Sequence, residues 1–137
     1  MESWEIVSDR YGELVDKLRE SDTTTHLSDP DRTIWYVVTV RCKIDMSGFE
    51  SLFNGTLNEE ELLFLIAALD RLDEPELADA FRRAHAALRR VGYLDMPHRL
   101  WSEFDPELEA ELAEIEDVIV TNERLWDLDE KLAALIA

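Results

Sequence analysis

The chain has 137 residues, 46% of them hydrophobic, which suits one folded domain spanning residues 1–137 with a packed core. Its 32 acidic and 14 basic residues give a formal net charge of -18, which disfavours direct binding to nucleic acid or an anionic membrane and favours a basic protein partner. Cys42 is the single cysteine, which excludes an internal disulfide, and no run approaches the roughly 20 apolar residues of a membrane span, so we expect a cytoplasmic protein.

The first third of the chain contains one clear helix and one ambiguous segment. Apolar residues recur at helical spacing over residues 3–20, and a Ser-, Thr- and Asp-rich loop follows over residues 21–31. Residues 33–44, TIWYVVTVRCKI, have the composition of a β-strand, yet Ile34, Val37, Val38 and Ile44 also fit a helical stripe. We favour a helix because no other segment could pair with a strand, and a short β-hairpin is the competing interpretation.

Residues 57–72 are predicted to form the central helix of the fold. This segment is rich in leucine and carries no charge between Glu61 and Asp70. It is too apolar on all sides for a surface helix and too short to cross a membrane. We therefore expect the other helices to pack around it.

Three further helices are predicted in the second half of the chain. Asp73-Glu74-Pro75-Glu76 is a strong helix start, and Gly92 suits the corresponding end. A second helix start at residues 105–107 precedes a core stripe of Leu108, Leu112, Ile115 and Ile119. The last helix is expected to begin near Thr121 or Asn122 and to bury Leu125, Leu128, Leu132 and Ile136. The predicted fold is therefore all-α, a single compact domain of about five or six helices.

The acidic residues are distributed unevenly along the chain. Residues 103–137 hold twelve acidic and two basic residues, whereas residues 80–102 hold one acidic and five basic residues. Positions 103–117 contain eight carboxylates and no basic residue. Residues i and i+4 of a helix are about 6 Å apart along its axis, comparable to the axial spacing of charges in a nucleic acid.

This acidic helix has two interpretations. It could be a solvated face that maintains solubility, with the arginines of residues 82–90 folding back to pair with some of the acids. It could instead present negative charge to a basic site on another protein. Under the second interpretation, the expected partner-binding residues are Glu107, Glu109, Glu111, Glu114, Glu116 and Asp117, with Glu59, Glu60 and Glu61 as a second patch.

One local motif resembles a known family. The segment Gly48-Phe49-Glu50-Ser51-Leu52-Phe53-Asn54, followed by an acidic Leu-rich helix and by ELADAFRRAHAAL, is similar to the bacterial DNA-mimic-protein family, otherwise described as a domain of unknown function. Gly48, Phe49, Phe53 and Asn54 match its turn, whereas Met46, Ser47 and Ser51 depart from it. The resemblance implies an all-helical fold, a homodimer, and an acidic surface that imitates DNA and occupies a DNA-binding regulator. The four matching residues are expected to have a structural role.

The sequence offers little support for catalysis. His26, His85 and His98 lack metal-binding spacing, and no phosphate-binding loop or CxxC motif occurs, so we expect no enzyme activity, no metal and no cofactor. The acidity could serve solubility only, and two further alternatives to DNA mimicry remain open. One is an immunity- or antitoxin-like inhibitor of a basic toxin or nuclease, and the other is an enzyme of unfamiliar type that uses buried carboxylates.

Overall fold

The computed structural model describes residues 2–20, 24, 26–53, 57–95 and 106–136, and every regular element among them is helical. The elements are α1 (Ser3–Arg19), α2 (Asp29–Ser47), α3 (Phe49–Ser51), α4 (Glu59–Arg71), α5 (Pro75–Arg90), η2 (Tyr93–Asp95), α6 (Pro106–Asn122), η4 (Arg124–Asp127) and α7 (Asp129–Ala134). The predicted all-α class is confirmed.

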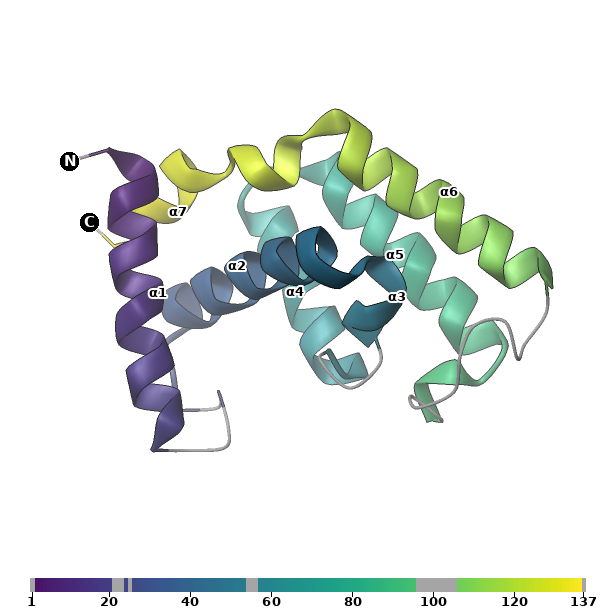
Figure 1. The fold of residues 1–137 in the computed structure, drawn as a ribbon, viewed down its shortest axis with the longest axis horizontal. Helices are drawn as coiled ribbons and strands as arrows, with labels where there is room; N and C mark the ends of the chain where they lie inside the picture. Colours follow the sequence, from purple (N-terminus) through teal and green to yellow (C-terminus); the bar gives the residue numbers. More distant parts are fainter. Residues whose placement is uncertain (1, 21–23, 25, 54–56, 96–105, 137) are drawn as a thin grey trace.

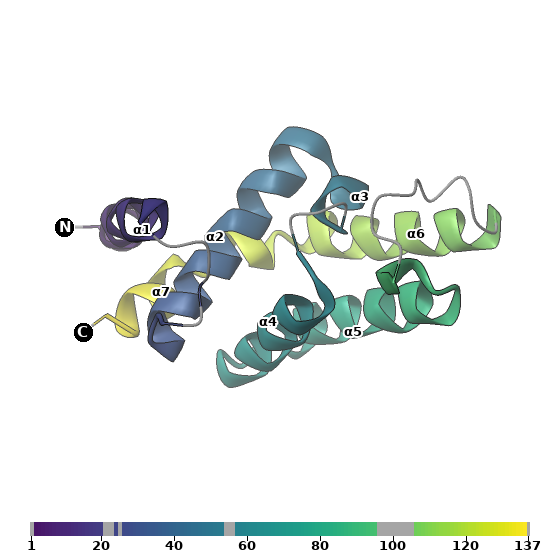
Figure 2. The same ribbon diagram turned by 90° about the horizontal axis from the view of Figure 1, so that it is seen from below.

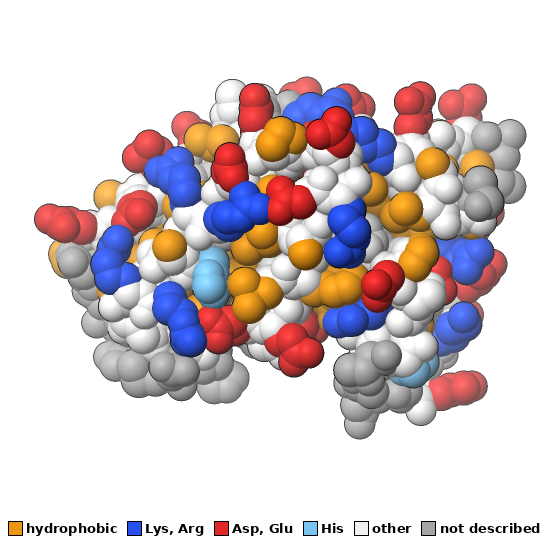
Figure 3. Space-filling model, turned by 180° about the vertical axis from the view of Figure 1, so that it is seen from behind, with side chains coloured by type: hydrophobic (Ala, Val, Ile, Leu, Met, Phe, Trp, Pro, Cys, Tyr) orange, Lys and Arg blue, Asp and Glu red, His pale blue; other side chains and the backbone are white. Residues whose placement is uncertain are grey.

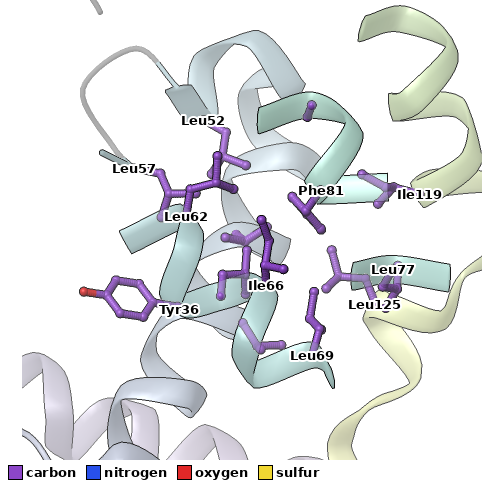
Figure 4. Close-up of a cluster of buried hydrophobic side chains, with 14 of the residues drawn as sticks. Tyr36, Leu52, Leu57, Leu62, Ile66, Leu69, Leu77, Phe81, Ile119 and Leu125 are labelled. Carbon is purple, nitrogen blue, oxygen red and sulfur yellow. The ribbon is translucent and has the colours of Figure 1, made fainter. Parts of the chain in front are cut away.

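The helices pack around one hydrophobic core, and Figures 1 and 2 show how they are arranged. α2 lies in front of the α4–α5 pair in Figure 1, and α6 runs alongside α5. α1 stands at one end of the molecule, where it packs against α2 and α7, and both termini lie at this end. Side chains from α2, α4, α5, α6 and η4 converge in the core shown in Figure 4.

Residues 33–44 lie within α2, so the β-hairpin interpretation is wrong. The helix starts where Ser28 Oγ accepts a hydrogen bond of 3.3 Å from the backbone N–H of Asp31, with Pro30 in the first turn. Ile34 and Val37 are completely buried. Burial of this apolar face against the other helices outweighs the weak strand propensity of its β-branched residues.

The central helix is shorter than residues 57–72. α4 starts at Glu59 because Asn58 and Glu61 form a capping box, and Leu57 and Leu72 are buried just outside its ends. Leu62 and Leu69 face the core. Leu63 is 47% exposed, so the expectation that α4 is buried on all sides is wrong, and one side of the helix faces water.

The core stripe of α6 is placed as predicted, since all four of its residues, Leu108, Leu112, Ile115 and Ile119, are completely buried. The predicted start of the last helix is wrong, because α6 continues through Asn122. The chain then breaks at Glu123, which has a φ of 57°, in the left-handed region. η4 and α7 follow separately, and they bury Leu125, Leu128 and Leu132, while Ile136 is only partly buried.

A charged cluster ties this C-terminal segment to the turn between α4 and α5. Glu74 is 6% exposed and pairs with both Arg124 and Lys131. Lys131 Nζ also donates a hydrogen bond of 2.7 Å to the backbone carbonyl of Leu72 at the end of α4. The cluster therefore fixes the position at which the chain leaves α6, and with it the surface described next.

Candidate partner-binding surface

A turn made of a glycine and two aromatic residues joins α2 to α3. Gly48 ends α2 with a φ of 86°, which a residue with a side chain rarely adopts. The rings of Phe49 and Phe53 are both 1% exposed and meet edge to face with centroids 5.1 Å apart. Phe49 also lies 6.1 Å from the ring of Phe81 on α5. Asn54, the last residue of the motif, lies outside the described residues.

One predicted binding residue on α6 belongs to this turn. Glu116 Oε2 accepts a hydrogen bond of 2.9 Å from the backbone N–H of Phe49, the first residue of α3. A helix start leaves such N–H groups without an intrahelical partner and attracts negative charge. The charge of Glu116 is therefore used inside the protein, where it joins α6 to α3.

Two further α6 acids face the arginines of α5. Arg90 Nη2 lies 2.9 Å from Glu111 Oε2, and Arg83 Nη2 lies 3.8 Å from Glu114 Oε1. Figure 3 shows that Lys and Arg side chains on the face behind that of Figure 1 are interspersed with acidic ones and do not form a continuous basic patch. The negative charge of Glu111 and Glu114 is therefore partly compensated within the molecule.

The second predicted patch, at the start of α4, is also largely occupied. Glu59 Oε2 lies 3.2 Å from Arg89 Nε and 2.9 Å from His85 Nε2. Glu61 completes the capping box with Asn58 and accepts a hydrogen bond of 3.1 Å from the hydroxyl of Tyr36. Glu60 lies between them in sequence, is exposed, and forms no ion pair with another residue in the described ranges.

The remaining predicted acids of α6 are Glu109 and Asp117, together with Glu107, which falls on the same flank of the helix as Glu111 and Glu114. Glu107, Glu109 and Asp117 are exposed. Glu109 and Asp117 form no ion pair or hydrogen bond with other side chains in the described part of the chain. They are eight residues apart, which places them about 12 Å apart along the helix and within about 80° of each other around its axis. The outer side of α6 is therefore defined by Glu109 and Asp117, which lack partners among the described side chains, whereas Glu111, Glu114 and Glu116 have partners within the protein.

Sequence reasoning missed an acidic hollow next to this outer side. It has a volume of about 520 Å³ and is lined by Asp45, Val120, Glu123, Trp126 and Asp127. Trp126 Nε1 donates a hydrogen bond of 3.0 Å to Asp45 Oδ2 from a position 81 residues later in the chain. No local pattern could reveal this neighbour pair, although the density of acids after Thr121 indicated a charged end.

The most buried carboxylate among the described residues has a structural role. Hydrogen bonds from Arg124, supported by Lys131, lower the pKa of Glu74 despite its burial. A catalytic proton donor would require a raised pKa. Within the described residues, no group of three or more potential metal ligands occurs, and no helix has the length and apolar content needed to cross a membrane.

Comparison with known proteins gives one match. A family model described as DMP19-like protein matches residues 25–137, which include every helix from α2 to α7 and exclude α1. No curated protein and no solved structure matches the chain. The matched segment contains the Gly48 turn, the acidic helix α6 and the hollow beside it.

Proposed function

Because the chain belongs to the DMP19-like protein family, we propose that it is a non-enzymatic DNA mimic whose acidic surface binds the DNA-binding face of a basic regulator. The observation that carries this proposal is the uncompensated outer side of α6. Glu109 and Asp117 form no ion pair with other described residues there, while Glu111 and Glu114 pair with α5 and Glu116 bonds to the α3 turn. The protein is proposed to act in the cytoplasm.

Negative charge on this side would act in the way that phosphates act. The phosphates of duplex DNA contribute most of the attraction for DNA-binding proteins, through lysine and arginine side chains that neutralise them. Glu109 and Asp117 span about 12 Å along the helix axis, the rise of three to four phosphates of one strand at about 3.4 Å each. Glu60 at the start of α4 supplies further exposed charge. The complex should therefore weaken steeply as salt is added.

The test is a pull-down from the lysate of the native host at low salt, followed by elution with a salt gradient. The E109Q/D117N variant removes two charges from the proposed surface. The matched control is D9N/E20Q, which removes two exposed charges at α1, outside the matched segment. The proposal expects a basic DNA-binding protein that the wild type and the control retain and E109Q/D117N loses.

If both variants retain the captured protein equally, capture does not depend on a specific surface of the chain. The acidity would then serve solubility.

An inhibitor of a basic toxin or nuclease is the second candidate, because it would use the same electrostatics. The hollow beside α6 supports this candidate, because a concave acidic site suits a single protruding basic side chain. The identity of the captured protein separates the two candidates. A homodimer, which the family resemblance implies, stays a prediction that sedimentation equilibrium would check.

A further inference from the structure

The hollow beside α6 combines two kinds of surface that suit one type of side chain. Its carboxylates come from three places, namely Asp45 at the end of α2, Glu123 at the left-handed break, and Asp127 in η4. Its apolar walls are the indole of Trp126 and the side chain of Val120, which is 44% exposed. The site is therefore concave, aromatic and negatively charged.

The carboxylates of the hollow are only partly compensated by positive charges within the protein. Arg124 pairs with Asp127, but it also pairs with Glu74 on the opposite side. Asp45 is held by the neutral N–H of Trp126, which leaves its negative charge in place. Glu123 is exposed and forms no ion pair with any residue in the described ranges. An additional cation would therefore be attracted.

We propose that this hollow receives an arginine side chain of the basic partner. This inference rests on the proposed function and identifies where on the surface one partner residue is bound. A planar guanidinium can stack on the Trp126 ring while it donates hydrogen bonds to carboxylates around it. The aliphatic part of the same side chain would cover Val120, which lines the hollow and is 44% exposed.

Charge complementarity and position both select this occupant. An anionic group would be repelled by Asp45 and Glu123, and a purely apolar group would remove water from these carboxylates without pairing them. Lysine carries the right charge but is more strongly hydrated and lacks the planar face. Asp117 lies one helical turn before Val120, so the hollow continues the outer side of α6 and one partner could contact both.

The test uses the full chain and the tripeptides Gly-Arg-Gly, Gly-Lys-Gly and Gly-citrulline-Gly as probes. Citrulline keeps the shape of arginine and lacks its charge. Binding is followed by the shift of the Trp126 indole N–H signal, which the W126F variant identifies among the four tryptophans. We expect a saturable shift with the arginine peptide, weaker binding of the lysine peptide and no saturable shift with the citrulline peptide.

A matched pair of variants localises the effect. E123Q is expected to weaken the arginine peptide by about threefold, the scale of one partly exposed charge contact, whereas E130Q, an exposed acid that does not line the hollow, should leave binding unchanged. Equal shifts with arginine and citrulline, or unchanged affinity in E123Q, would overturn the inference.

This result is independent of the pull-down. If E109Q/D117N loses the partner but the arginine peptide does not bind, the proposal that the hollow receives an arginine is wrong and the proposed function stands. If the peptide binds but no partner is captured, the proposed function fails.

Discussion

The carboxylate of Glu116 accepts a hydrogen bond of 2.9 Å from the backbone N–H of Phe49, 67 residues earlier in the chain. This bond connects the acidic helix α6 to the glycine and aromatic turn that carries the family resemblance. The sequence pattern alone predicts that Glu116 binds a partner, whereas in the structure its carboxylate contacts the α3 turn. Glu116 contributes to the fold first, because it satisfies a donor at the start of α3.

Loss of this acceptor should destabilise the protein. E116A is expected to lower the free energy of unfolding by about 1–2 kcal/mol, because the N–H of Phe49 is left without its partner in a part-buried position. E116Q keeps an acceptor oxygen and should cost less. Urea denaturation measures both. D117A, on the exposed side of α6, is the control and should change stability by less than about 0.5 kcal/mol. Equal stability of E116A and D117A would contradict the structural role.

Gly48 should be sensitive to substitution for a different reason. A Cβ added there would lie 3.9 Å from Glu116 Oε2, an ordinary contact, so space is available and the φ of 86° is the obstacle. G48A is expected to lower the free energy of unfolding by about 1–2 kcal/mol. The matched control is G12A within α1, which meets nothing within 4 Å and should stabilise the protein by up to about 1 kcal/mol. A thermal melt in which both variants shift in the same direction would contradict this account.

The Glu74 cluster should make stability depend on pH in the acid range. Arg124 and Lys131 lower the pKa of Glu74 in the folded protein, so its stabilising contribution is present above the unfolded-state pKa and is lost as pH falls through the folded-state pKa. At neutral pH, E74Q is expected to cost about 1–2 kcal/mol, a reduced value because Arg124 and Lys131 stay partly exposed.

The measurement is urea denaturation of both proteins between neutral pH and pH about 3, since the ordinary pKa of Glu is about 4.3. The stability difference between wild type and E74Q should shrink as pH falls. A difference that stays constant over this range would mean that the charge of Glu74 does not stabilise the fold.

The inner acids of α6 should matter less for partner binding than the outer ones. E111Q/E114Q removes as many charges as E109Q/D117N, but it removes them from ion pairs with Arg90 and Arg83. We expect the inner variant to retain more affinity for the captured partner, as measured by titration calorimetry at fixed salt. An inner variant that binds more weakly than the outer one would place the binding surface on the α5 side.

The helices were predictable because their information is local. Apolar periodicity and helix start signals located α1, α4, α5 and the start of α6, since a helix is determined by residues within a few positions of each other. The β-branched composition of α2 favoured a strand, which is not what forms. A helix was nevertheless predicted, because no other segment of the chain could pair with a strand. Thr121 and Asn122 indicated a helix boundary close to the true end of α6, but the break at Glu123 carries no Gly or Pro, so its left-handed backbone and the later start of α7 were not predictable.

The site was only partly predictable because its charges depend on tertiary packing. The sequence identified an acidic helix, yet which acids remain uncompensated depends on how α5 places Arg83 and Arg90 beside it. The hollow depends on Asp45 and Trp126, which only the folded chain brings together. A count of charges cannot separate an acid that binds a partner from one that holds a turn.

The most direct test of the central claim is competition with DNA for the captured partner. The partner is bound to a fluorescently labelled duplex, and the chain is added while the anisotropy of the duplex is measured. DNA mimicry predicts full displacement of the duplex by the wild type, with E109Q/D117N requiring a clearly higher concentration. A stable complex containing partner, duplex and chain together, with no displacement at saturation, would contradict the claim.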